Sequence, residues 1–146
     1  MNCVLCENKK NVFWENSSFY IVDVNDEIFP GFIRVISKRH VAEMSELSDN
    51  ERTMLWSILH IVEKTMLAEL RPDKINYAQF GNMVPHLHWH IMARWTDDSH
   101  FPECPWGPEQ RKPSRQQIKE RRCLMEKFKL SLIEILNREF LQEAPL

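Results

Sequence analysis

The chain reads HLHWHIM over residues 86–92, and this stretch decides the fold. In a β-strand, successive side chains point to opposite faces of the sheet. A strand over 86–95 therefore places His86, His88 and His90 on one face and turns the intervening apolar residues toward a core. Histidine titrates near neutral pH, so three in register predict a chemical surface with a hydrophobic backing. The alternative, a patch of hydrogen-bonded histidines without chemistry, is typical of one histidine rather than of three in register.

The spacing of the three histidines limits what they can bind together. Neighbours on one face of a strand lie roughly 6.6 Å apart, so His86 and His90 are separated by roughly 13 Å along the backbone. Zinc–nitrogen bonds are about 2.0 Å long, and a zinc-dependent hydrolase with its metal on all three histidines is therefore disfavoured. A linear row suits one nucleophile with a neighbour on each side. His88, the middle residue, is the predicted nucleophile, because histidine can attack phosphorus and form a covalent intermediate.

Periodicity and capping signals place the other elements around this strand. Ser48 followed by Glu51 is a capping-box signature, and it predicts a helix that ends near Arg71, before a proline. A second long helix is expected over 114–140, after an irregular arm over 97–113 that contains several prolines. The apolar face of that helix is Leu124, Phe128, Leu132, Ile135 and Leu136. Further strands are predicted over 12–15, 19–24, 32–36 and 75–80. The order β-β-β-α-β-β-α predicts an α+β fold in which helices pack on an antiparallel sheet.

Composition narrows the class of protein. The 146 residues, with 43% hydrophobic content, are enough for one domain with a core, or for one protomer of an oligomer. A net charge of −2 gives no support for binding nucleic acid in bulk. The sequence has no apolar run near the roughly 20 residues of a membrane span and no secretory signal, so the expected location is the cytoplasm. There the four cysteines are expected as thiols or metal ligands rather than as disulfides.

The histidine stretch resembles the signature of the histidine triad superfamily, in which three histidines alternate with apolar residues. Two other segments are also similar to that family: GNMVP over 81–85 precedes the triad, and PGFIRVISKRH covers 30–40. The resemblance extends over about residues 3–96. His90 stands where a nucleotidyl-transferring relative carries glutamine, so the resemblance favours the nucleotide hydrolase-like branch.

This resemblance implies an α+β fold with a five-stranded antiparallel sheet, a long helix packed on it and a C-terminal helix. It implies a homodimer of a single domain over 1–146, with a core over about 3–96 and a C-terminal arm and helix over 97–146. The implied activity is hydrolysis of a phosphoric anhydride or phosphoramidate at the α-phosphate of a nucleotide conjugate, with nucleotidyl transfer as a related reaction. His88 would form a nucleotidyl-histidine that water resolves, and His90 would contact the phosphoryl or leaving group. The expected substrates are dinucleoside polyphosphates and nucleoside phosphoramidates.

The substrate-binding residues follow from the same resemblance, with departures. Asn82 stands where many relatives have glutamine and Met83 where they have serine or threonine, at positions that contact the phosphate in the family. Asn76 matches a family asparagine near the phosphate, and would otherwise be a strand-end hydrogen-bonding residue. Asp23 and Asn25 are the candidates for holding the ribose, although Asp23 could equally be an ordinary strand-end residue. The departures at 82 and 83 support a second hypothesis, a nucleotide-binding regulatory protein with little turnover.

The pair Cys3 and Cys6 has the spacing of half a zinc site. Some relatives and the related sugar-phosphate transferases complete such a site with two histidines, which correspond here to His40 and His86. Four protein ligands leave no open position, so the implied zinc is structural, and it would fix His86 beside the nucleophile. In zinc-free relatives the two corresponding histidines hydrogen-bond each other instead. No organic cofactor is expected.

Overall fold

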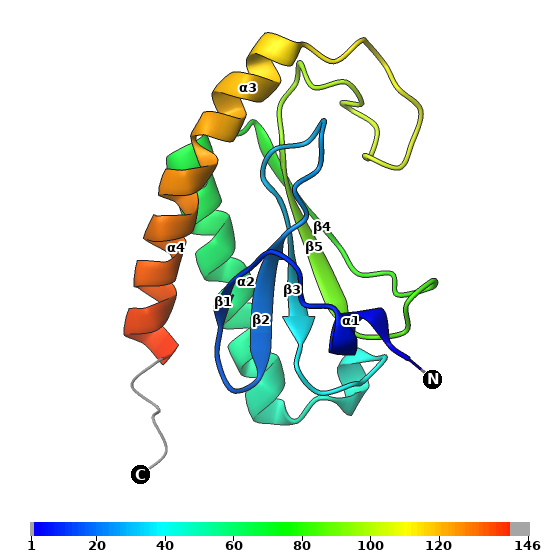
Figure 1. Ribbon diagram of the computed structural model, residues 1–146, viewed down its shortest axis with the longest axis vertical. Helices are drawn as coiled ribbons and strands as arrows, with labels where there is room; N and C mark the ends of the chain where they lie inside the picture. Colours follow the sequence, from blue (N-terminus) through cyan, green and yellow to red (C-terminus); the bar gives the residue numbers. More distant parts are fainter. Residues whose placement is uncertain (1, 141–146) are drawn as a thin grey trace.

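A computed structural model describes residues 2–140; Met1 and residues 141–146 of the predicted domain lie outside that range. Its centre is a five-stranded sheet in the order β1-β2-β3-β5-β4, in which every neighbouring pair is antiparallel (Figure 1). The strands are β1 (Val12–Glu15), β2 (Phe19–Asp23), β3 (Phe32–Ser37), β4 (Lys74–Ala78) and β5 (His88–Arg94). The predicted α+β fold with five antiparallel strands is confirmed.

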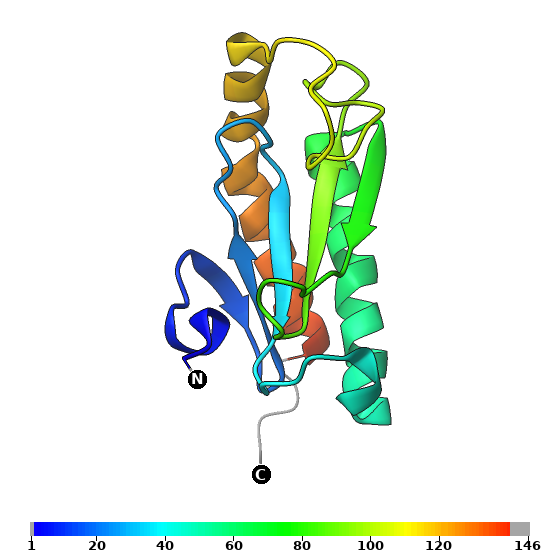
Figure 2. The same ribbon diagram turned by 90° about the vertical axis from the view of Figure 1, so that its right-hand side faces the viewer.

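Two long helices cover one face of this sheet, α2 (Asp49–Leu70) and α4 (Met125–Phe140). Figure 2 looks onto the opposite face, with both helices behind the strands. The capping box predicted for α2 is present, because Ser48 Oγ accepts from the Glu51 N–H and the Glu51 carboxylate accepts from the Ser48 N–H. Two short elements were not predicted from the sequence, the helix α1 (Val4–Glu7) and the 3₁₀ turn η1 (Met44–Glu46).

A hydrophobic core fills the space between the sheet and these helices. The buried apolar stripe of α2 is Leu55, Ile58, Leu59, Val62, Met66 and Leu70. Leu87 and Ile91 join the same core from the triad segment, and half-buried Trp89 packs at its margin. The predicted hydrophobic backing of the histidines is therefore confirmed. Because a one-residue slip would turn every side chain of a strand to the other face, this burial fixes which residues face away from the helices.

The prediction of one helix over 114–140 is wrong, because the helix breaks at Leu124 into α3 (Arg115–Cys123) and α4. No residue of α3 is buried, whereas α4 buries Met125, Phe128, Leu132 and Leu136. Leu124, expected on the apolar face, is exposed, and Met125 takes the inward position instead. Packing on the core therefore fixes which side of α4 faces inward, whereas α3 buries no residue.

The triad strand also begins later than predicted, at His88 rather than at His86. The Leu87 N–H donates to the Val41 carbonyl and the Ser37 N–H donates to the Leu87 carbonyl, so this part of the chain pairs with residues at and beyond the end of β3. His86 consequently precedes the regular strand, and its ring has partners different from those of the other two histidines. None of the helices within residues 2–140 combines the length and apolar character needed to cross a membrane.

Candidate active site

The register between β3 and β5 builds a histidine row on the face opposite the long helices. Ile36 pairs with His88 and Arg34 pairs with His90, so all four side chains lie on one face. The ring centroids of His88 and His90 are 5.0 Å apart. In Figures 1 and 2, α1 and the loops that follow β5 lie on this side of the sheet. His88 and His90 are both buried, so the row is not an open strand face.

Hydrogen bonding fixes the tautomer of His88. Its Nδ1 lies 2.6 Å from the carbonyl oxygen of His86. A carbonyl oxygen only accepts, so Nδ1 carries the proton and Nε2 carries the lone pair. Burial lowers the pKa of His88, and the nearby charge of Arg34 lowers it further. The ring is therefore neutral at pH 7, and its unprotonated nitrogen is Nε2.

His90 is neutral at the same pH. Burial, followed by the charges of Arg34 and His88, lowers the pKa of His90 to about 4. Its ring makes edge-on contacts with Phe32 and Trp106, at centroid distances of 5.6 and 5.1 Å. Two neutral imidazoles side by side can thus approach an anionic substrate, one as a nucleophile and one as a hydrogen-bond partner.

A cavity of about 450 Å³ opens onto these two histidines. That volume suits a ligand of nucleotide size. Its lining includes the segment 80–84, so the structure brings the predicted Asn82 and Met83 to the triad. Met83 is 96% exposed, however, and its side chain is turned to solvent. From elsewhere in the chain the lining is completed by Leu5, Arg34, Cys104 and Trp106.

The other predicted substrate-binding residues lie outside the lining of this cavity. Asn76 pairs with Met92 on the triad face, but its Oδ1 accepts a 2.9 Å hydrogen bond from Arg94. Asp23 faces the helices and forms an ion pair with Lys129 of α4 at 2.8 Å. The Asn25 N–H donates to Asp23, which makes Asp23 a turn residue at the end of β2.

The arm, residues 97–113, was predicted only as an irregular segment, but the structure fastens it over the site. Arg94 is buried and forms a bidentate ion pair with Asp98, at 2.8 and 3.0 Å, and also donates to the Glu103 carbonyl. Arg111 donates to the Asp98 and Phe101 carbonyl oxygens and closes the arm on itself. The arm thereby places Trp106 against His90 and, at 5.4 Å between centroids, against Phe80.

Sequence reasoning missed both Arg34 and Trp106. Arg34 carried a signal, because strand alternation within 32–36 places it on the face opposite Ile33 and Val35, which are buried in the core. Pairing with the triad strand could therefore have placed it beside a histidine. Trp106 carried no such signal, since its position depends on contacts between the arm and residues far away in the sequence.

A second cluster joins the start of the chain to the triad. Cys3, Cys6, His40 and His86 place their ligand atoms within 4.8 Å of one another. Four individual contacts among them range from 3.0 to 3.5 Å. Tetrahedral zinc with these donors separates its ligand atoms by roughly 3.3–3.8 Å, so the four residues fit that metal.

The hydrogen bond on the other side of the His86 ring supports metal binding. Its Nε2 lies 2.6 Å from the Ser37 carbonyl oxygen, so Nε2 carries the proton and Nδ1 presents a lone pair to the cluster. Burial lowers the pKa of His86, which keeps this nitrogen unprotonated. The 3.0 Å contact between His40 and His86 is also compatible with a direct hydrogen bond between them.

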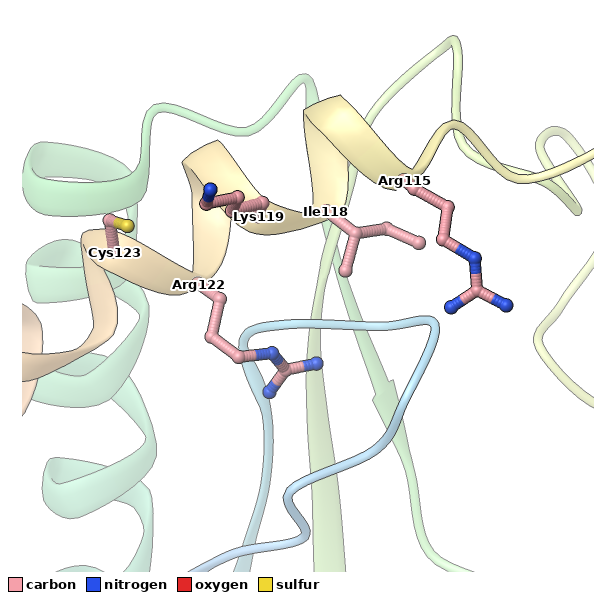
Figure 3. A pocket seen from close by; sticks show the side chains of 5 residues that line it. All are labelled: Arg115, Ile118, Lys119, Arg122 and Cys123. Carbon is pink, nitrogen blue, oxygen red and sulfur yellow. The ribbon is translucent and has the colours of Figure 1, made fainter.

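Another cavity, of about 360 Å³, lies along α3 and away from the triad. Figure 3 shows its lining, in which three cationic side chains accompany Ile118 and Cys123. Arg122 reaches the loop that follows β2 and donates to the Asp26 carbonyl and to Asn25. Within the described part of the chain this lining contains no histidine and no carboxylate, so the residues suited to group transfer are those of the cavity beside the triad.

The chain is similar in sequence to known proteins. The chain is 28% identical over 78 residues to the AP-4-A phosphorylase of Mycobacterium tuberculosis, which covers 49% of this chain and 40% of that protein. It is 27% identical over 92 residues to the bis(5'-adenosyl)-triphosphatase of Saccharomyces cerevisiae, which covers 59% of this chain and 45% of that protein. The alignments thus span less than half the length of these curated relatives.

Solved structures share the fold at low identity. A histidine triad protein from Marinobacter aquaeolei superposes with a TM-score of 0.66 and 23% identity, covering 84% of this chain and 91% of that one. A zinc-bound histidine triad family protein from Mycobacterium smegmatis superposes with a TM-score of 0.59 and 17% identity. The match covers 90% of this chain and 98% of that one. The family model described as the HIT domain matches residues 6–97, which is more than half of the chain. Sheet order, triad and family match therefore agree, and this protein belongs to the HIT family.

Proposed function

We propose that this protein is a nucleotide hydrolase that acts at the α-phosphate of a nucleotide conjugate through a covalent intermediate on His88. One observation carries the proposal. His88 lines the cavity, and its Nδ1–H donates to the His86 carbonyl at 2.6 Å. Its other ring nitrogen, Nε2, is therefore unprotonated. A neutral imidazole with a free lone pair needs no separate base to act as a nucleophile. The HIT family match and the two nucleotide-named relatives support a nucleotide substrate.

The reaction proceeds in two displacements. The lone pair of His88 Nε2 forms a bond to phosphorus, and the bond from phosphorus to the bridging atom breaks with its electron pair on the leaving group. The resulting imidazolium keeps its Nδ1 proton in the hydrogen bond to the His86 carbonyl. Water then attacks the phosphorus, the nitrogen–phosphorus bond breaks, and a nucleoside monophosphate is released while the proton of water passes to product or solvent. His90 contacts the phosphoryl or leaving group.

The cluster Cys3, Cys6, His40 and His86 is proposed to hold a structural zinc ion. The ion would supply no chemistry to the reaction, because four protein ligands leave no position for substrate. Its effect would be indirect: a fixed His86 fixes the carbonyl oxygen that orients His88. We expect the protein to act in the cytoplasm, where thiol ligands stay reduced.

A nucleotide-binding regulatory protein with little turnover is the second candidate. Met83 favours it, because this side chain offers no hydrogen bond to a phosphate and points to solvent. Asn82 keeps an amide in the cavity lining but is one methylene shorter than glutamine. Such a protein would keep its nucleotide affinity when His88 is replaced.

Steady-state hydrolysis of diadenosine triphosphate and of an adenosine phosphoramidate separates the two candidates. His88→Ala should lower turnover by about 1,000-fold or more, as loss of a nucleophile does. His60→Ala is the matched control, because His60 is an exposed histidine of α2. Binding of nucleotide without turnover by the wild-type protein would favour the regulatory candidate. Undiminished turnover in His88→Ala would contradict the proposed mechanism.

A further inference from the structure

Arg34 is a charged residue in the middle of the triad face, and the mechanism above gives it no task. β3 pairs with β5 so that Arg34 stands opposite His90, while Ile36 stands opposite His88. The Nε of Arg34 lies 3.4 Å from Nδ1 of His90. The side chain is half-buried and lines the same cavity as both histidines. Arg34 is therefore built into the reaction site rather than into the solvent-exposed surface.

The guanidinium of Arg34 brings an unbalanced positive charge to the cavity. Within the described part of the chain its one side-chain hydrogen bond is the contact with His90, and it takes part in no ion pair. Among residues 2–140, no aspartate or glutamate lines the cavity. Burial lowers the pKa of Arg34, yet an arginine stays charged at neutral pH. Withdrawing a cation from water is costly unless an anion pairs with it, and a guanidinium matches phosphate oxygens in a bidentate manner.

The position of Arg34 along the strand indicates which phosphate it meets. In displacement at phosphorus, the nucleophile and the leaving group lie roughly in line on opposite sides of the phosphorus atom. Arg34 and His90 lie one same-face step, roughly 6.6 Å, along the sheet from His88. In the opposite direction the row ends at His86, which is buried. Both of its ring nitrogens already have partners, because Nδ1 contacts the two cysteine sulfurs and Nε2 contacts the Ser37 carbonyl. Arg34 and His90 line the cavity and His86 does not, so the leaving group extends toward Arg34.

The contact with Arg34 also identifies the tautomer of His90. Its Nε–H can only donate, so Nδ1 of His90 accepts this hydrogen bond and the ring proton resides on Nε2. His90 then presents an N–H donor to the bridging oxygen or phosphoryl oxygen of a substrate. The two side chains together form a pair of donors directed at negative charge.

We infer that Arg34 binds the phosphate that leaves, which makes dinucleoside polyphosphates the preferred class of substrate over nucleoside phosphoramidates. This inference rests on the proposed function and adds a substrate preference to it. The amine released from a phosphoramidate carries no phosphate and gives the guanidinium no partner. The negatively charged phosphates of a polyphosphate leaving group would lie beside the guanidinium of Arg34. Arg34 would thereby supply the phosphate contact that Met83 lacks.

The test compares Arg34→Met and Arg34→Lys on two substrates that share an adenylyl group, diadenosine triphosphate and an adenosine phosphoramidate. Methionine keeps an apolar stem of similar length, and Arg138→Met, at an exposed position of α4, controls for loss of an arginine. In Arg34→Met, kcat/KM should fall by about 100-fold for the polyphosphate and by less than about 5-fold for the phosphoramidate, with Arg34→Lys in between. Equal losses on both substrates, or no loss on either, would overturn the inference.

A binding measurement keeps the inference testable if neither substrate is hydrolysed. Pyrophosphate is titrated by calorimetry into His88→Ala protein and into protein carrying both His88→Ala and Arg34→Met. A drop in affinity of about 10-fold or more in the double variant supports an Arg34 phosphate contact whatever the turnover. Equal affinities in two variants with matching circular dichroism spectra exclude that contact. Failure of the hydrolase proposal would instead appear as wild-type protein that binds pyrophosphate and releases no product.

Discussion

His86, His88 and His90 differ in chemistry because their ring nitrogens have different partners. His86 donates from Nε2 to the Ser37 carbonyl, His88 donates from Nδ1 to the His86 carbonyl, and His90 accepts at Nδ1 from Arg34. The sequence pattern predicts the row and its middle nucleophile, because strand alternation is a local property. It does not predict the tautomers of His86 and His90, since these depend on partners 49 and 56 positions away.

Buried His90 should make the stability of the fold pH-dependent. Its pKa of about 4 lies below the ordinary 6.5, so the unfolded chain binds the proton more tightly. The stabilisation by the neutral ring is fully present above pH 6.5 and is lost as the pH falls toward 4, at up to about 1.4 kcal/mol per pH unit. Urea denaturation from pH 7.5 to 4.5 should show a shallower decline in His90→Gln than in the wild-type protein. His60→Gln, which removes an exposed histidine, is the control. Parallel curves for His90→Gln and the wild type would contradict this assignment.

At the scale of secondary structure, the elements predicted well are those with local signals. The capping box and apolar stripe located α2, and alternation located the five strands to within about two residues. The break at Leu124 has no local signal: neither glycine nor proline lies between Arg115 and Phe140, and the break follows from packing of α4 alone on the core. The path of the arm likewise depends on contacts with buried Arg94, which reach Asp98 and the Glu103 carbonyl.

The ion pair between Arg94 and Asp98 should be the main anchor of the arm. Burial alone would raise the pKa of Asp98, but hydrogen bonds from Arg94 and from the His100 and Phe101 N–H groups outweigh it and lower this pKa. Asp98→Asn leaves Arg94 buried without its counterion and should cost about 3–5 kcal/mol of unfolding free energy. Urea denaturation measures the loss, and limited proteolysis should show earlier cleavage within 97–113.

Asp97→Asn is the matched control for this prediction. Asp97 is half-exposed and pairs with Arg121, so removing its charge should cost less than about 1 kcal/mol. If the two variants unfolded at the same urea concentration, the buried pair would not be the anchor.

At the scale of the whole molecule, the cysteine–histidine cluster ties the N-terminal segment to the chain after β3 and to the triad. Protein purified without chelators should contain about one equivalent of zinc, measured by atomic emission spectroscopy. Replacing Cys3 and Cys6 by serine should abolish zinc binding and lower Tm by more than about 5 °C, because binding of a structural metal adds to folding free energy. Cys123→Ser, at an exposed position in α3, should keep both the zinc and the Tm. Metal-free wild-type protein with an unchanged Tm would exclude the zinc site.

The homodimer implied by the family resemblance stays a prediction, and one surface is suited to it. β4 is an edge strand of the sheet, and Trp56, Leu67 and Tyr77 are exposed on α2 and β4. An unpaired edge beside apolar side chains is a typical surface for self-association. Light scattering should give roughly twice the 17.5 kDa of one chain, and Trp56→Glu should shift the mass to that of one chain. A wild-type mass of one chain would exclude the dimer.

The central claim is that His88 becomes covalently bonded to the nucleotide. Intact-protein mass spectrometry, after mixing with diadenosine triphosphate and quenching without acid, tests it directly, since a phosphorus–nitrogen bond survives such conditions. We predict a transient mass increase of one adenylyl group in the wild-type protein and none in His88→Ala. Hydrolysis by the wild type without any adduct, or an adduct that persists in His88→Ala, would contradict the account.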